Sequence, residues 1–202
     1  MYYALLYYPK FDTKTEENIE AFRRKYDPFV DSLRPHMPFV FPVPCSEIDE
    51  EKLTKHIETV LGKWKPFRIE IKGFKKSWDH WLFLLLKKGS EEATALHDEL
   101  YTGILSPYLR RDIAYIPHVG IGLFARKDAG YNVLDPRKAT FDANMYSQAL
   151  EEAESMKINS FDTIDRLFLE ELIIKADDAS MLTSASSNEV TIKTGGSKEL
   201  KL

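Results

Sequence analysis

Two features that are scarce in this sequence exclude whole classes of protein. Cys45 is the single cysteine, so neither an internal disulfide nor a zinc site built from cysteines can form, and a reducing cytoplasm is the expected compartment. No apolar run approaches the ~20 residues that a membrane span needs, and the run from Trp81 to Leu86 is far too short. The first ten residues lack a basic leader and a cleavage site, so they predict a strand and not a signal peptide. We therefore expect no membrane partner.

An excess of positive charge is also missing. The chain carries 28 basic and 32 acidic residues, for a net charge of −4. A long nucleic-acid backbone favours a basic surface, so we do not expect a long nucleic acid as a partner. A small nucleotide or an RNA end held in a local pocket remains compatible with this balance.

What is present is enough apolar sequence for a core, because 44% of the 202 residues are hydrophobic, which fits one large domain or two small lobes. Hydrophobic periodicity and capping residues predict strands and helices that alternate irregularly, with one hairpin. The predicted strands are 2–8, 36–43, 66–74, 79–87, 116–124 and 164–175. The predicted helices are 13–33, 46–61, 90–104 and 142–156. This order favours an α+β fold with largely antiparallel sheets.

The end of the chain differs in composition. Residues 176–202 are rich in Ser, Ala, Thr, Gly and Lys and contain no aromatic residue. We expect a polar and poorly ordered tail there, in which residues 189–194 are the one stretch compatible with a strand.

Two strands share an unusual beginning. The first starts Pro35-His36-Met37-Pro38, the second starts Pro117-His118-Val119-Gly120, and the two histidines are 82 residues apart (118 − 36 = 82). Because side chains alternate along a strand, His36, Pro38 and Val40 should share one face, as should His118, Gly120 and Gly122. Met37, Phe39 and Phe41, like Val119, Ile121 and Leu123, should point into a core. The small residues beside each histidine predict an open cleft in front of it.

Two such histidines suit acid–base chemistry on a phosphoester. An unperturbed imidazole titrates near pH ~6.5, so one neutral ring can activate water or a hydroxyl while the other, protonated, gives its proton to the leaving oxygen. No metal or cofactor is required for this pair. A lone histidine at the start of an apolar strand is more often structural than catalytic, so the hypothesis depends on the pair. His80 and His97 match no motif and are expected to be structural or exposed, and His56 is expected on the surface.

The layout resembles the 2H phosphoesterase superfamily, which includes the 2′-5′ RNA ligase-like proteins and cyclic phosphodiesterases, and looks like an uncharacterised bacterial branch of it. The family's signature is two copies of His-x-Thr/Ser-x about 80 residues apart. The resemblance covers about residues 2–175. It also draws on further stretches: Arg24-Lys25-Tyr26-Asp27-Pro28, Leu100-Tyr101-Thr102-Gly103-Ile104-Leu105 and Asp165-Arg166-Leu167-Phe168.

The resemblance implies one bilobal domain over residues 1–175, in which two sheets and outer helices surround a central cleft. It implies His36 and His118 as the catalytic residues. It implies, as substrate, a cyclic or 2′-5′ phosphodiester of a nucleotide or an RNA end.

The motifs depart from the family at the phosphate-binding position. Pro38 and Gly120 stand where the family has Thr or Ser, and neither has a side-chain donor. Loss of one oxyanion donor typically costs ~10²–10³ in rate. Two functions therefore remain open: a phosphoesterase in which Arg34, Arg126 or the Arg110-Arg111 pair supplies the missing donors, or a catalytically weakened module that binds a nucleotide or phosphate.

Overall fold

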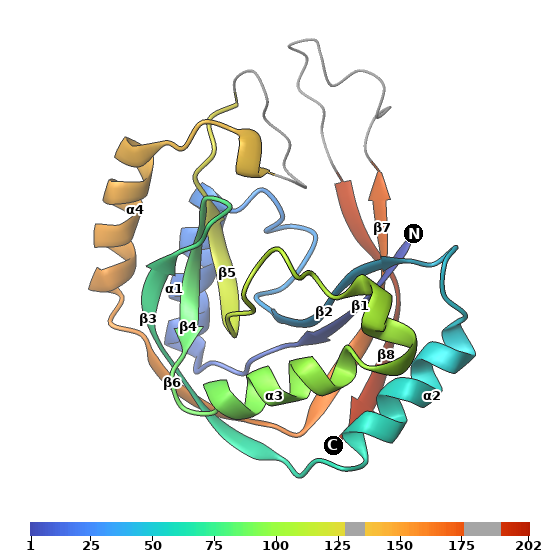
Figure 1. Cartoon of the computed structure of the whole chain (residues 1–202). Coiled ribbons are helices and arrows are strands. Elements are labelled where there is room, and N and C mark those ends of the chain that lie inside the picture. The colour runs from blue at the N-terminus through green and yellow to red at the C-terminus, as the bar shows by residue number, and fades with distance from the viewer. Residues whose placement is uncertain (128–135, 176–190) are drawn as a thin grey trace.

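The computed structural model describes residues 1–127, 136–175 and 191–202, which form two four-stranded antiparallel sheets with helices packed around them (Figure 1). The first sheet has the strand order β2-β1-β7-β8 and the second has β5-β4-β3-β6. The first sheet comprises β1 (Tyr2–Tyr7), β2 (Met37–Pro44), β7 (Arg166–Lys175) and β8 (Thr191–Lys201). The second comprises β3 (Phe67–Lys76), β4 (Trp81–Leu86), β5 (His118–Leu123) and β6 (Asn159–Ile164). The predicted α+β class and the antiparallel sheets are confirmed.

The helices are α1 (Thr13–Tyr26), α2 (Glu50–Leu61), α3 (Ser90–Leu100) and α4 (Ala143–Ser155), with 3-10 turns η1 (Gly103–Tyr108) and η2 (Pro136–Lys138). Helices α1, α2 and α4 start at acidic caps, α3 starts after Gly89, and each of these helices packs on a strand. The side chains of Asp12, Asp49 and Asp142 accept the N–H groups at the starts of α1, α2 and α4. Helix α1 contacts β5, α2 contacts β8, α3 contacts β2 and α4 contacts β3. Within the described residues, no helix has the length and apolarity to cross a membrane.

The helix boundaries correct the prediction in three places. Helix α3 ends at Leu100 instead of running to residue 104, and the 3-10 turn η1 follows from Gly103. Helix α1 ends at Tyr26 instead of running to residue 33, because Asp27 precedes Pro28 and takes an extended conformation (φ −105°, ψ 114°). Residues 27–33 therefore form turns that lead the chain back to His36. Helix α2 starts at Glu50, after the cap Asp49, and not at residue 46.

Strand β6 was missed by the sequence prediction. Strand β6 is an edge strand, and most of its side chains face solvent, so its sequence, Asn-Ser-Phe-Asp-Thr-Ile, is mostly polar. Even Phe161 is 64% exposed. Only Ser160 and Ile164 are buried. A single apolar inward position gives no periodicity, and its pairing with β3 along six residues is what makes it a strand.

Strand β8 covers residues 191–194, which were predicted as compatible with a strand, and it continues to Lys201, so the expectation of poor order is wrong from residue 195 onward. It pairs with β7 from Arg166↔Lys201 to Lys175↔Thr191. The part of the predicted tail over 176–190 lies outside the described residues. Leu200 is 4% exposed and pairs with the fully buried Leu167, so the end of the chain contributes to the main core.

We expect Leu200→Ala to lower the free energy of unfolding by about 2–4 kcal/mol, because it removes buried methyl groups from a packed core. Lys201→Ala, on the exposed face of the same strand, is the matched control and should change it by less than about 0.5 kcal/mol. Equilibrium denaturation with urea measures both. Equal, small changes would mean that β8 does not dock on the core.

Candidate active site

The two predicted histidine strands meet at the junction of the two sheets. His36 directly precedes β2 and His118 is the first residue of β5, and these strands are edges of different sheets that contact each other. Figure 1 shows β5 beside β2 near the centre of the molecule. The Tyr115 hydroxyl donates to the carbonyl oxygen of Pro38 at 2.9 Å, which ties the chain before the second histidine to the chain after the first.

Both imidazoles are held by the same local hydrogen bond. The Nδ1 of His36 lies 2.8 Å from the carbonyl oxygen of Arg34, and the Nδ1 of His118 lies 2.5 Å from that of Ile116. A carbonyl oxygen can only accept, so Nδ1 carries the hydrogen in each ring. Nε2 is then the nitrogen that takes or gives a proton. Each histidine thus bonds the residue two positions before it, and both rings have the tautomer that proton transfer at Nε2 requires.

The two rings influence each other electrostatically. Burial lowers the pKa of His118 to about 4; its bond to Ile116 opposes this, and the charge of His36 adds to it. Burial also lowers the pKa of His36, while the Arg34 carbonyl raises it, Arg23 lowers it, and the carboxylates of Asp27 and Glu170 raise it. The rings therefore lie within electrostatic reach of one another. The prediction that both face one cleft remains a prediction.

The surroundings of His118 are aromatic. The Phe83 ring stacks on the imidazole with centroids 3.4 Å apart and planes 19° apart. Phe83 pairs with Gly120 across β4 and β5, so both residues are on the face that carries His118. A Cβ built at Gly120 would meet Trp81 ring carbons at 3.5 and 3.8 Å, which is ordinary contact. A small side chain therefore fits at this position.

Two face assignments from the sequence are wrong. Gly122 does not open a space before His118, because a Cβ there would lie 2.9 Å from the Cβ of Tyr26 and 3.1 Å from Phe124; the glycine permits close packing of α1 on β5. Val40 is buried whereas Phe41 is only half-buried. The pairing of β2 with β1 has register shifts at this point, so strict alternation is lost.

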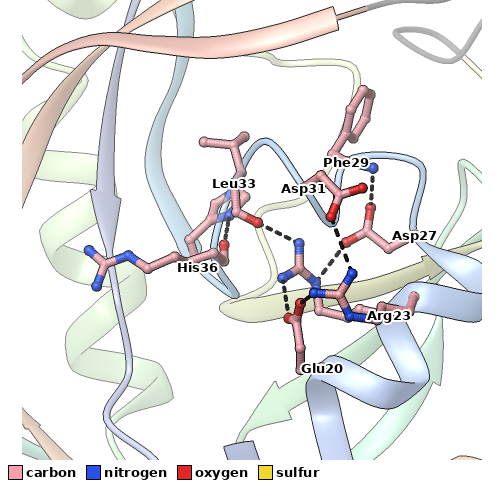
Figure 2. Close-up of polar contacts among 9 residues, drawn as sticks. Glu20, Arg23, Asp27, Phe29, Asp31, Leu33 and His36 are labelled. Carbon is pink, nitrogen blue, oxygen red and sulfur yellow. Dashed lines mark hydrogen bonds and ion pairs between the residues drawn. The ribbon is translucent and has the colours of Figure 1, made fainter. Parts of the chain in front are cut away.

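A buried arginine fixes the turns that lead to His36 (Figure 2). Arg23 is 1% exposed; its Nε donates to Asp27 at 2.8 Å and its Nη2 donates to the carbonyl oxygen of Leu33 at 2.6 Å. Its third contact is Glu20, at 3.4 Å. A buried charge must be paired, so these contacts hold the segment against α1 and place the start of β2.

Tyr8 is the contact between His36 and the rest of the first sheet. Its ring meets the His36 imidazole edge-on, with centroids 6.3 Å apart, and the Arg34 guanidinium carbon lies 4.0 Å from the ring centroid. The Tyr8 hydroxyl donates to Glu170 at 2.9 Å. Arg34 is exposed, and its stacking on Tyr8 places it beside His36.

Comparison with known proteins agrees with this arrangement. The sequence model of the 2′-5′ RNA ligase superfamily matches residues 11–164, which include both histidine strands. The chain belongs to the 2′-5′ RNA ligase superfamily. The resemblance to 2H phosphoesterases is thereby confirmed.

Individual relatives within this superfamily are distant. A predicted phosphoesterase of Bacillus licheniformis is 24% identical over 139 residues, which cover 68% of this chain and 80% of the relative. A second, from Bacillus cereus, is 25% identical over 109 residues, or 53% of this chain and 62% of the relative. A crystal structure of a phosphoesterase has a TM-score of 0.51 at 11% identity and covers 100% of this chain and 97% of its own, which shows the shared fold. E. coli LigT in complex with 3′-AMP has a TM-score of 0.49 at 12% identity, covering 98% and 96%.

Pro38 and Gly120, which are predicted to stand at the Thr/Ser positions of the superfamily motif, have distinct surroundings. Pro38 offers only its carbonyl oxygen, which Tyr115 occupies, and Gly120 faces the Trp81 ring. Arg126 is exposed beyond the end of β5, where its backbone N–H donates to Thr140 at 2.8 Å. The structure thus brings Arg34 beside a histidine, while a role for Arg126 remains a prediction.

Other charged and histidine residues lie elsewhere. Arg110 donates to Asp112 at 2.7 Å. A pocket of about 190 Å³ contains Arg110 and Arg111 among its lining residues, and neither His36 nor His118 is among them. A shallower pocket of about 550 Å³, lined by Ser90, Thr94, Tyr115 and Pro117 among others, also excludes both histidines. The catalytic hypothesis therefore depends on the bonding of the imidazoles and not on these pockets.

The remaining histidines have structural partners. His97 is buried and bonds the Phe39 carbonyl oxygen at 2.8 Å, and His80 bonds that of Ala139 at 3.0 Å. His56 was expected on the surface but is half-buried, because its Nε2 reaches the carbonyl oxygen of Leu100 at 2.9 Å. Among the residues that the structure describes, no three His, Cys, Asp or Glu side chains are grouped as metal ligands would be.

Proposed function

We propose that this chain is a phosphoesterase that opens a cyclic or 2′-5′ phosphodiester of a nucleotide or an RNA end, with His36 and His118 as its acid–base pair. The observation that carries this proposal is the matched pair of Nδ1–carbonyl bonds, which leaves Nε2 of both rings for proton transfer. Membership of the 2′-5′ RNA ligase superfamily supports the reaction class. The net charge of −4 supports a small ligand over a long nucleic acid.

The environments of the two rings separate their roles. Burial lowers the pKa of both rings; the carboxylates of Asp27 and Glu170 oppose this effect at His36, whereas the charge of His36 adds to it at His118, on which Phe83 stacks. His118 is then the base: its Nε2 takes a proton from water as the water oxygen bonds to phosphorus. His36 is the acid: its Nε2–H protonates the sugar oxygen as the bond from phosphorus to that oxygen breaks. The product is a phosphomonoester with one new free hydroxyl.

The phosphate oxygens need donors that Pro38 and Gly120 do not supply. Arg34, stacked on Tyr8 beside His36, is the first candidate, and Arg126 is the second. A guanidinium can donate two parallel hydrogen bonds to a phosphate, so one arginine can replace more than one hydroxyl.

The test is a pH-resolved assay with 2′,3′-cyclic nucleotides and 2′-5′-linked oligonucleotides. Turnover needs neutral His118, present above pH about 4, and protonated His36, present only below its lowered pKa. We expect kcat/KM to peak between about pH 4 and pH 6.5 and to fall about tenfold per pH unit above that. The profile of kcat should lie at higher pH, because a bound phosphate anion favours both imidazolium forms. An optimum above pH 8 would contradict the mechanism.

The second candidate function is a module that binds the same ligands without turnover, which the absence of a hydroxyl at Pro38 and Gly120 favours. It predicts that calorimetry detects binding of a nucleotide, weakened by replacement of either histidine, while the assay detects no product. Turnover at rates typical of enzymes would exclude it.

A further inference from the structure

Glu170 is a buried carboxylate on the face of the first sheet that carries Tyr8. It is 3% exposed and lies opposite Ala4 in the pairing of β7 with β1, next to the Phe168–Leu6 pair. Residues opposite one another in antiparallel strands share a face, and Ala4 and Leu6 belong to the small cluster against which Tyr8 packs. The carboxylate therefore points to the His36 side of the sheet.

Only one of the two carboxylate oxygens of Glu170 accepts hydrogen bonds from the described residues. Its Oε1 accepts both the Tyr8 hydroxyl and the Ser197 hydroxyl, each at 2.9 Å. Its Oε2 is fully enclosed and has no donor within the described part of the chain. A carboxylate has room for about four hydrogen bonds, and a buried charge without a counter-charge is costly. Two neutral hydroxyls satisfy only part of this need.

Among the described side chains, those of residues 1–127, 136–173 and 196–202, no lysine or arginine forms an ion pair with Glu170. Two cationic groups contact its partner Tyr8: the Arg34 guanidinium, whose carbon lies 4.0 Å from the centroid of the Tyr8 ring, and the imidazole of His36. Tyr8 links Glu170 to His36, because its hydroxyl bonds Glu170 while its ring meets the His36 imidazole with centroids 6.3 Å apart. A negative charge this close favours the protonated form of an imidazole.

The residues of this arrangement lie outside the stretch that the superfamily model matches. The match covers residues 11–164, whereas Tyr8 precedes it and Glu170 and Ser197 follow it. Tyr8 directly follows β1, and the other two residues come from β7 and β8. Both histidines lie within the matched stretch, so the hydroxyl–carboxylate group behind His36 comes from sequence on either side of it.

We propose that Glu170 is a positioning residue of the His36 half-site: its bond to Tyr8 orients the ring that meets the His36 imidazole, and its buried negative charge opposes the loss of the proton that burial of His36 favours. The inference rests on the proposed function, in which His36 is the acid. It also gives β8 a role in the site, because Ser197 supplies the second donor to the same carboxylate oxygen.

Other charges around His36 act in both directions. Arg23 on α1 opposes protonation of His36 and Asp27 at the end of α1 supports it. The charge of His36 acts on the His118 ring on β5, and the Arg34 guanidinium lies over the Tyr8 ring, 4.0 Å from its centroid. Arg23 and Asp27 pair with each other at 2.8 Å, so their effects partly cancel. Glu170 is the one of these charges that is joined to the His36 ring through Tyr8, so its removal tests this link.

The experiment is an NMR titration of the His36 imidazole in the full chain, without substrate. Glu170→Gln keeps an oxygen that accepts from Tyr8 and Ser197 but removes the charge, and we expect it to lower the His36 titration midpoint by about one pH unit. The high-pH limb of the kcat/KM profile should move down by the same amount. Glu171→Gln, the same change one residue along β7 and on its other face, is the matched control and should leave the midpoint in place.

A second variant provides the test if Glu170→Gln destabilises the protein. Tyr8→Phe leaves Glu170 intact and keeps the ring against His36, but it removes the hydroxyl that joins the two groups, so it should also move the His36 midpoint. An unchanged His36 midpoint in both Glu170→Gln and Tyr8→Phe would overturn the inference. Shifted midpoints in a protein that turns over no phosphodiester would instead uphold the pairing and refute the proposed function.

Discussion

His118→Asn is expected to lower kcat/KM for a 2′,3′-cyclic nucleotide by about 10²–10⁴-fold, the usual contribution of one positioned acid or base. Asparagine is the most specific replacement, because it removes only the proton-transfer atom. Its amide nitrogen takes the place of Nδ1 and can still donate to the Ile116 carbonyl oxygen, while nothing replaces Nε2. The same logic applies to His36→Asn and the Arg34 carbonyl oxygen. Both variants should keep the local fold and lose the proton-transfer atom.

The double variant makes this prediction stronger. If the two rings act as one acid–base unit, His36→Asn combined with His118→Asn should cost little more than the worse single change. His56→Gln is the matched control, since glutamine can preserve the contact of Nε2 with Leu100 on a part of the chain outside the site. Activity that survives both single changes, at unaltered unfolding midpoints, would remove the two-histidine mechanism.

The two histidine strands of this candidate site could be predicted from the sequence because their signal is local. Pro35-His36 and Pro117-His118 each stand at the start of a strand, although the alternation after them gave the wrong face for Val40, Phe41 and Gly122. The bond from Nδ1 to the carbonyl two residues earlier is also local, so each short motif contains its own geometry. The antiparallel α+β class follows in the same way from hairpins mixed with helices.

The residues that support the histidines could not be predicted, because their contacts join distant parts of the chain. Glu170 looks like an ordinary outward residue of a strand until Tyr8, 162 positions away in sequence, is placed beside it. Arg23 has the spacing of a surface helix residue, and only the return of the chain at Leu33 buries it. Strand β8 carries few apolar residues, so its pairing with β7, and not its composition, orders it. The one available signal was an Arg23–Asp27 pair at helical spacing just before a proline.

Restoring the family hydroxyl at Gly120 is expected to raise turnover. Gly120→Ser places Cβ at ordinary contact distance from the Trp81 ring, on the face of β5 that carries His118, so the new hydroxyl can donate to a phosphate bound at the two histidines. Removal of one preorganised donor costs about 10²–10³ in rate, and a serine that still rotates should recover about tenfold to hundredfold in kcat. The gain should appear in kcat more than in KM if the hydroxyl binds the transition state more tightly than the substrate.

The matched control is two residues further along the same strand. Gly122→Ser adds the same atoms, but its Cβ would lie 2.9 Å from the backbone-anchored Cβ of Tyr26, so we expect a loss of about 1–3 kcal/mol in unfolding free energy and no gain in turnover. Single-turnover kinetics and urea denaturation on both variants separate chemistry from stability. A Gly120→Ser protein that folds like the parent but shows unchanged turnover would mean that the phosphate does not sit before Gly120. Arg34, the arginine beside His36, would then have to hold the phosphate from the other side. In that case Arg34→Lys, which cannot donate two parallel hydrogen bonds, should lower turnover by a larger factor than the gain expected for Gly120→Ser.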